Sequence, residues 1–277
     1  MNFHEIRYFN SLPVLLSENY SQSSMNNLRL ARIKVEGKQI NFAAILRLIE
    51  TSGYCILTFN SDLNIQRFSE SSYPYFGALM SQTQKSGSFI YDVEYDPQTN
   101  FSNMQLNSNS AQPMHTDGHF KEISPRYLSL YCIEQSKNGG FSQIILADDV
   151  YNYIKSLSLE IAELLFQEYI HYSRRMPKGG LFKYKKKLFF KRSDGKIGIC
   201  YNPIMYEIKS EKSIEQALTL INYFTNKPSN QIIFRLNPNE MLILDNERVL
   251  HGRTSFDKTS KRQLKRLWFT GEESEES

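Results

Sequence analysis

Two histidines and one aspartate are the residues of this sequence whose types and spacing could bind a transition metal. His115 and Asp117 are separated by one threonine, and residues i and i+2 of an extended chain project to the same side. An imidazole and a carboxylate could therefore reach one ion from a single short segment. His251 follows far downstream, at the end of an apolar run. Two histidines and one carboxylate on one face make the facial triad of a non-haem Fe(II) site, which leaves coordination positions open.

Each of these residues also has an ordinary structural interpretation. A His-x-Asp step is common on surface loops. A lone histidine after Val249 and Leu250 is more typical of a core or a strand end than of a metal ligand. The surrounding sequence is therefore needed to distinguish a metal site from a structural role.

Two arginines favour a site. Arg262 and Arg266 lie in a stretch that reads as a strand, and residues four apart on a strand share a face. Two inward guanidinium groups would carry an unpaired buried charge unless an anion met them. A dicarboxylate fits, because the arginine fork binds a carboxylate through two hydrogen bonds. From spacing alone, the alternative that one or both face solvent among neighbouring lysines stays open.

The elements that must position these residues are mostly short strands. Runs of apolar, β-branched and aromatic residues predict strands at 28–35, 54–59, 89–93, 127–133, 142–147, 231–236, 241–244, 248–253 and 263–269. Helical periodicity predicts helices at 41–50, 62–76, 150–157, 158–169 and 213–224. Asp148 and Asp149 are the expected N-cap of the third helix. This order predicts a mainly β fold with flanking helices and a sandwich or jelly-roll core; a general α+β fold is the alternative.

Composition excludes several classes of protein. The chain has 277 residues, of which 40% are hydrophobic and 22% charged, and this is typical of a globular protein. No apolar run approaches the ~20 residues of a membrane helix, and the N-terminal residues lack the apolar core of a secretion signal. We therefore expect a cytoplasmic protein without a membrane partner. We also expect one domain over residues 1–277, with a disordered acidic tail at 271–277.

Charge and cysteine content give two further expectations. A formal net charge of +4 is mild for this length, so it does not by itself predict a nucleic-acid partner. The chain has three cysteines, at positions 55, 132 and 200, each among apolar or aromatic neighbours. An odd number at such spacings forms no disulfide framework or metal motif, so we expect small buried thiols.

The stretch 174–192 is strongly basic and is interleaved with aromatic residues. It could bind an acidic substrate or a nucleic-acid backbone, but the favoured interpretation is a solvated hairpin with an apolar inner face. His119 is expected to be a loop residue, with contact to substrate as the alternative. Arg253 is expected to form an ion pair with Asp245 or Glu247.

Four segments together make the sequence resemble a known family. A His-x-Asp step at 115–117 is followed by Gly-Gly-Phe-Ser at 139–142, Asp-Asn-Glu-Arg-Val-Leu-His-Gly-Arg at 245–253, and the two arginines. The sequence resembles the Fe(II)/2-oxoglutarate-dependent dioxygenases of the taurine dioxygenase and clavaminate synthase-like superfamily. The resemblance covers roughly residues 112–269. A Pro-Gly-Asp turn that is frequent in the family is replaced by Asn-Pro-Asn-Glu at 237–240.

The resemblance implies a fold and a metal site. The family fold is a double-stranded β-helix, or jelly roll, which agrees with the strand pattern. His115, Asp117 and His251 would bind Fe(II). Related halogenases have a small residue at the place of Asp117, which leaves room for a halide. A carboxylate there implies hydroxylation or another oxidation instead.

The resemblance also implies a co-substrate site. Arg262 would pair with the distal carboxylate of 2-oxoglutarate, helped by the hydroxyl of Ser142, and Arg266 would lie near the carboxylate that chelates iron. Some relatives place the main arginine a few residues later, so the division of roles between the two arginines stays open. Tyr201 and Asn202 would line the substrate pocket.

The implied activity is the O2-dependent oxidation of a small molecule, amino-acid-like or a secondary metabolite, with release of succinate and CO2. One alternative is the same chemistry on a nucleobase or a protein side chain. A second is a binding module that keeps the jelly roll without catalysis. Substrate identity, the position and type of oxidation, and the oligomeric state are not given by the sequence.

Overall fold

Two β-sheets form the centre of the structure, a computed structural model that describes residues 32–35, 40–82, 89–96, 107–175, 181–203 and 212–271. The larger sheet has the strand order β1 (Arg32–Val35), β2 (Tyr54–Phe59), β12 (Glu240–Asp245), β5 (Tyr127–Glu134), β14 (Gln263–Phe269), β3 (Ile90–Glu94). The smaller sheet has the order β11 (Ile232–Phe234), β6 (Ser142–Leu146), β13 (Val249–Arg253), β4 (Gln112–His115). Neighbouring strands are antiparallel except for the parallel pair β1 and β2.

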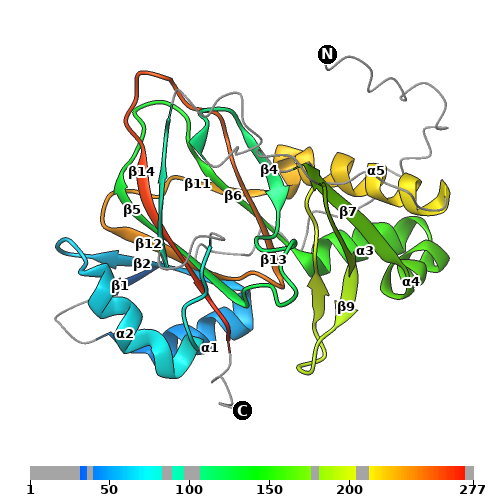
Figure 1. Ribbon diagram of the computed structural model, residues 1–277, viewed down its shortest axis with the longest axis horizontal. Coiled ribbons are helices and arrows are strands. Elements are labelled where there is room, and N and C mark those ends of the chain that lie inside the picture. Colours follow the sequence, from blue (N-terminus) through cyan, green and yellow to red (C-terminus); the bar gives the residue numbers. More distant parts are fainter. Residues whose placement is uncertain are drawn as a thin grey trace.

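Helices and two hairpins surround these sheets (Figure 1). The helices are α1 (Phe42–Ser52), α2 (Ile65–Phe76), α3 (Ala147–Leu157), α4 (Leu159–Gln167), α5 (Lys212–Asn226) and a short 3-10 helix (Pro228–Asn230). The hairpins pair β7 (Tyr169–Arg175) with β8 (Leu181–Lys187), and β9 (Phe189–Lys191) with β10 (Ile197–Ile199). The predicted mainly β fold with flanking helices is confirmed.

Alternation along the strands separates three layers of core. On β2, Tyr54 and Ile56 belong to a cluster shared by the two sheets, whereas Cys55 and Leu57 belong to a cluster beneath α1 and α2. The smaller sheet shows the same alternation. On β6, Ile144 belongs to the shared cluster, whereas Ile145 belongs to a cluster with residues of α3, α4 and α5. Both faces of the central strands are therefore covered, which explains why β2 is apolar at nearly every position.

The start of α3 differs from the prediction. The helix begins at Ala147, directly after β6, and its N-cap residue Leu146 makes no side-chain capping bond. Instead, the amide of Ala147 donates to the carbonyl of Arg248 at 2.7 Å. The predicted cap at Asp148 and Asp149 was therefore wrong. Both carboxylates lie in the first turn, where they interact favourably with the helix dipole.

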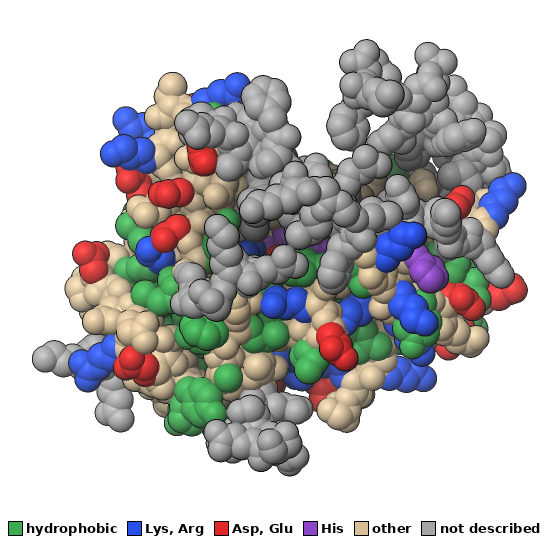
Figure 2. Space-filling model, viewed as in Figure 1, with side chains coloured by type: hydrophobic (Ala, Val, Ile, Leu, Met, Phe, Trp, Pro, Cys, Tyr) green, Lys and Arg blue, Asp and Glu red, His purple; other side chains and the backbone are tan. Residues whose placement is uncertain are grey.

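The basic stretch forms the hairpin that the favoured interpretation predicted. β7 and β8 pair antiparallel with Tyr172 opposite Tyr184, and Tyr172 is buried while His171, Lys183 and Lys185 are exposed. On the face shown in Figure 2, the described basic side chains at this end of the molecule are interspersed with acidic and apolar ones.

The expectations about the cysteines, membrane helices and the C-terminal tail can be compared with the structure. The cysteines are buried and unpaired. Within the described part of the chain, no helix is both long enough and apolar enough to cross a membrane. The expectation of a disordered tail concerns residues 272–277, which lie outside the described residues, and Gly271 donates its amide to the carbonyl of Phe76.

A buried ion network fixes the turn between β12 and β13. Arg192 contacts the carboxylates of Asp245 and Glu247 at 3.1 and 2.7 Å, and the side chains of Arg192 and Asp245 are 4% and 2% exposed. The expectation that Arg253 fills this role was wrong. Its Nη2 donates to the carbonyls of Ser108 and Ser110, at 2.7 and 2.6 Å, so it holds a loop.

Removing the arginine from this network should destabilise the protein. Among the described residues, Arg192→Met leaves the buried carboxylate of Asp245 with the longer ion pair to Arg126, at 3.5 Å, and a hydrogen bond from the Glu247 amide. We expect the free energy of unfolding to fall by about 3 kcal/mol, the lower end of the range for breaking a buried ion pair. Denaturant unfolding measures it. Lys191→Met, at the exposed neighbouring position, is the matched control, and an equal loss in both variants would contradict the prediction.

Candidate active site

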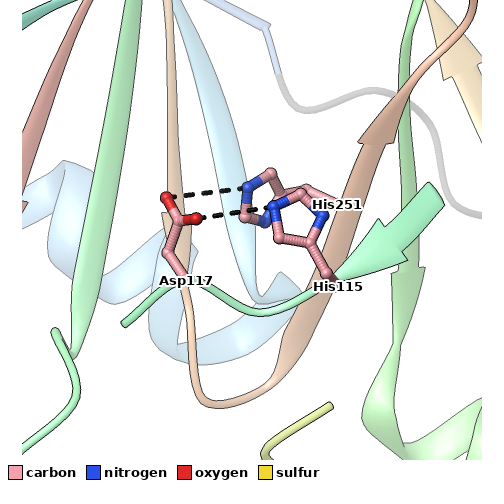
Figure 3. Close-up of side chains that lie close together, drawn as sticks. All are labelled: His115, Asp117 and His251. Atoms are coloured by element: carbon pink, nitrogen blue, oxygen red, sulfur yellow. Dashed lines mark ion pairs between the residues drawn. The ribbon is translucent and has the colours of Figure 1, made fainter. Parts of the chain in front are cut away.

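His115, Asp117 and His251 converge at one end of the smaller sheet (Figure 3). His115 ends β4 and lies opposite His251 of β13 in the strand register, while Asp117 lies in the loop that follows β4. One nitrogen or oxygen atom from each residue lies within 4.8 Å of the others, and all three residues are buried. His115 Nε2 is 3.4 Å from Asp117 Oδ1, and His251 Nε2 is 3.9 Å from Asp117 Oδ2. We call these residues the triad.

The imidazoles are held in a state that can bind a metal. Nδ1 of His115 lies 2.8 Å from the carbonyl oxygen of Pro113. A carbonyl can only accept, so Nδ1 carries the proton and Nε2 keeps its lone pair. Burial, aided by the positive charge of Arg266, lowers the pKa of His251 to about 3, against the opposing effect of Asp117. His251 is therefore neutral above that pH.

The carboxylate of Asp117 is fixed by donors from β14. Its Oδ2 accepts from Nη1 of Arg266 at 3.0 Å and from the indole Nε1 of Trp268 at 2.9 Å. Burial alone would raise the pKa of Asp117, but Arg266 and the two histidines outweigh it and hold the pKa well below its usual range. Asn246 holds the backbone, because its Oδ1 accepts from the Asp117 amide at 2.8 Å. Asp117 is thus an ionised carboxylate of fixed orientation.

These donors fit ferrous iron. Two neutral imidazoles and one ionised carboxylate are the ligand set of a non-haem Fe(II) centre, which binds three protein groups and leaves other positions open. Partners behind the ligands, such as Pro113 and Trp268, orient them as outer-shell groups do in metal proteins.

Arg262 is a buried cation without a counter-charge among the described residues. Its residue is 6% exposed, its Nε has no hydrogen-bond partner, and no described carboxylate lies within ion-pair distance. Burial lowers the pKa of Arg262 to about 10. Its guanidinium lies 5.7 Å from the centre of the Phe256 ring, and Arg253 lies over the same ring at 4.8 Å. Such an arrangement is costly without an anion and suits a carboxylate of a ligand.

Both arginines are buried, Arg266 within β14 and Arg262 directly before it, which resolves the alternative that the spacing left open, but their surroundings differ. Leu264 and Trp268, which alternate with them, belong to the cluster between the sheets. Arg266 is already paired with Asp117, and its Nε donates to Oε1 of Gln82 at 2.7 Å. Only Arg262 is therefore available to bind an added anion.

The glycine segment lies against Arg262. A Cβ atom on Gly140 would lie 3.2 Å from Cδ of Arg262 and 2.5 Å from Oγ of Ser136, so only glycine fits here. Two residues later, Ser142 is buried and pairs with Arg253 across β6 and β13. The side chain of Ser142 shares the inward face with Ile144, because side chains alternate along a strand.

The sequence did not single out three residues that contact the triad. Asn246 lies inside the Asp-Asn motif, and Trp268 lies two positions after Arg266, so strand alternation alone places it on the same face. Gln112 has its Nε2 3.2 Å from Nε2 of His115; no periodic signal identifies it. His119 lies in the turn after β4, as expected for a loop residue, but it is buried, and the Asn202 amide lies 3.3 Å from its Nδ1.

The family of the protein follows from comparison with known sequences. A family model described as "Taurine catabolism dioxygenase TauD, TfdA family" matches residues 17–268. The chain belongs to this family. The predicted family and enzyme class, a dioxygenase of the taurine dioxygenase type, are confirmed.

Individual relatives are distant. The chain is 26% identical over 176 residues to 3-((Z)-2-isocyanoethenyl)-1H-indole synthase of Fischerella ambigua (strain UTEX 1903), a match that covers 58% of this chain and 64% of that protein. The matched region thus spans less than two thirds of this relative.

Solved structures extend the comparison of the fold. An asparagine oxygenase in complex with Fe(II), 2S,3S-3-hydroxyasparagine and succinate superposes with a TM-score of 0.63 and 16% identity, over 83% of this chain and 78% of that one. PvcB of Pseudomonas aeruginosa gives a TM-score of 0.64 and 15% identity, over 86% and 84%. At these identities the likeness establishes a shared fold.

Substitution of Trp268, the only tryptophan of the chain, would test whether its hydrogen bond to Asp117 contributes to metal binding. Trp268→Phe keeps an aromatic ring but removes the donor to Oδ2, so we expect the affinity for Mn(II) to fall about tenfold, as for other outer-shell partners. Titration calorimetry measures it. Tyr54→Phe is the control, since that hydroxyl is also buried in the cluster between the sheets and has no hydrogen-bond partner. Unchanged affinity in Trp268→Phe would show that the contact does not matter.

Proposed function

We propose that this protein is an Fe(II)- and 2-oxoglutarate-dependent oxygenase that hydroxylates or otherwise oxidises a small, amino-acid-like or secondary-metabolite substrate. The triad would hold iron, and Arg262 would bind the distal carboxylate of 2-oxoglutarate with the hydroxyl of Ser142. The single observation that carries the proposal is a buried cluster of two histidines and one aspartate that could hold a metal, together with a buried arginine that has no counter-charge among the described residues.

The residues of the chain have distinct roles in this proposal. Pro113 fixes the His115 tautomer so that Nε2 can bind the metal. Arg266 and Trp268 keep Asp117 ionised and oriented. Burial of the site excludes water from the reaction. When bound, iron supplies the activation of O2 that couples conversion of 2-oxoglutarate to succinate and CO2 with oxidation of the substrate.

The arrangement also supports two finer interpretations. Two antiparallel sheets that share one core, with the triad on the smaller one, are consistent with the double-stranded β-helix, or jelly-roll, core. One domain over residues 1–277 and a cytoplasmic location remain predictions from the sequence. Because Asp117 occupies the third protein ligand position, oxidation rather than halogenation is the expected outcome.

The substrate class draws on relatives. The names of an asparagine oxygenase and of an isocyanoethenyl-indole synthase both describe small nitrogen-containing molecules. The test is a screen of amino acids and related metabolites for succinate release that depends on both Fe(II) and 2-oxoglutarate, with products identified by mass spectrometry. Oxygen gain or hydrogen loss in one substrate is the expected result. Absence of metal-dependent binding of 2-oxoglutarate to the purified protein would overturn the proposal.

A further inference from the structure

A β-bulge directs Gln112 towards the triad. His251 and Arg253 are two residues apart on β13, yet their partners on β4 are His115 and Gln112, which are three apart. The extra residue lies at Pro113 or Met114, and a proline, which lacks an amide proton, is tolerated at a bulge. In a regular strand Gln112 and His115 would point to opposite faces. The bulge places both on the inner face, as bulges near active sites often do.

The neighbouring glycine shows that this bulge is built into the site. A Cβ atom on Gly252 would lie 2.8 Å from the carbonyl oxygen of Gln112 and 2.9 Å from Sδ of Met114. A side chain at this position would therefore push β4 away from β13. Gly252 lies between the two residues of β13 whose partners flank the bulge, so the close approach of the strands depends on it.

The amide of Gln112 contacts the atom that would bind the metal. Its Nε2 lies 3.2 Å from Nε2 of His115, and that nitrogen bears a lone pair because Nδ1 carries the proton. Gln112 therefore donates to the lone pair that a metal ligand must use. One lone pair cannot serve both partners, so metal binding displaces the amide. The amide then needs another acceptor, because a donor left unsatisfied in a partly buried site is costly.

The position of Gln112 shows where that acceptor lies. Along β13, Arg253 lies beyond His251, and Gln112 is paired with Arg253. Arg253 and Arg262 share the Phe256 ring. Gln112 is thus on the side of the triad that faces the buried arginine. An anion that reached from the triad towards Arg262 would therefore extend to the side on which Gln112 lies.

We propose that Gln112 is a contact residue for the metal-bound keto acid, donating a hydrogen bond from its side-chain amide to an oxygen at the metal-binding end of 2-oxoglutarate. This inference rests on the proposed function. In the metal-free protein the same amide donates to Nε2 of His115. Gln112 therefore competes weakly with the metal for this nitrogen, but it strengthens binding of the co-substrate once the metal is bound. The two effects have opposite signs, and this separates them from a merely structural role.

Calorimetry on the full chain tests both effects. Gln112→Met removes the amide and keeps the length of the side chain. Mn(II) should bind the metal-free variant as tightly as the wild type or more tightly, whereas 2-oxoglutarate should bind the Mn(II)-loaded variant about tenfold more weakly, since a hydrogen bond to a charged group contributes about 1.5–3 kcal/mol. The matched control is Gln143→Met, in the same sheet, at the position next to Ile144 and on the opposite face.

The outcomes are distinguishable. Unchanged binding of 2-oxoglutarate by Gln112→Met, or a parallel loss for Mn(II) and 2-oxoglutarate, overturns the role of Gln112. Failure of the wild type to bind 2-oxoglutarate in the presence of Mn(II) overturns the proposed function instead. If Gln112→Met does not fold, Gln112→Asn shortens the side chain but keeps the amide. It should show the same weakening for 2-oxoglutarate without weaker Mn(II) binding, and wild-type affinity in that variant also refutes the inference.

Discussion

The variants His115→Ala and His251→Ala are expected to lose metal binding and turnover while they keep the fold. Each removes one of three ligand groups. Loss of an outer-shell partner alone commonly weakens metal affinity about 10- to 100-fold, so loss of a ligand should exceed a hundredfold. Nδ1 of His251 has no hydrogen-bond partner among the described residues, so its removal leaves no broken protein contact at that atom. Calorimetric titration with Mn(II) and succinate release measure the two losses.

His171→Ala is the matched control, because this histidine is exposed on β7. It should retain wild-type metal affinity and turnover. Circular dichroism and thermal melting of the metal-free proteins should be close to those of the wild type for all three variants. Normal turnover in either triad variant would contradict the assignment of the metal site.

Arg262→Met should produce two opposite effects. Binding of 2-oxoglutarate should weaken by about a hundredfold or more, because one carboxylate of the co-substrate loses its buried partner, a loss of about 3 kcal/mol. In the absence of 2-oxoglutarate the variant should be more stable than the wild type, by about 1–3 kcal/mol, because a buried charge without a counter-charge is removed. Binding calorimetry and denaturant unfolding measure the two effects on the same preparation.

Lys261→Met, at the exposed neighbouring position, is the control and should change neither quantity. If Arg262→Met retained wild-type affinity for 2-oxoglutarate, another group would have to bind the distal carboxylate. A loss of stability in the metal-free state would show that Arg262 has a structural partner.

Local sequence patterns predicted many of the strands and most residues of the candidate site. The His-x-Asp step, the Asp-Asn motif with its histidine, and the arginines spaced four apart are local features, and the structure brings them together. Apolar runs such as 54–59 and 241–244 predicted strands correctly, because both faces of these strands are covered. These features need only strand alternation and burial.

The errors and omissions come from contacts between distant segments. The cap of α3 was misplaced because the Arg248 carbonyl, in the turn between β12 and β13, accepts from the first helical amide. Arg253 was assigned to the wrong partners because its carbonyl acceptors lie in a loop before β4. Gln112 could not be identified because a bulge reverses the alternation on which sequence patterns depend.

The triad and the co-substrate residues are divided between the two sheets. His115, His251 and Ser142 belong to the smaller sheet, whereas Arg262 directly precedes β14 of the larger one. A molecule held at both places ties one layer of the sandwich to the other. Its binding energy adds to the resistance of the whole fold to opening, in proportion to the logarithm of its concentration over its dissociation constant. In a cell, depletion of a common metabolite would then shorten the lifetime of the protein as well as stop its chemistry.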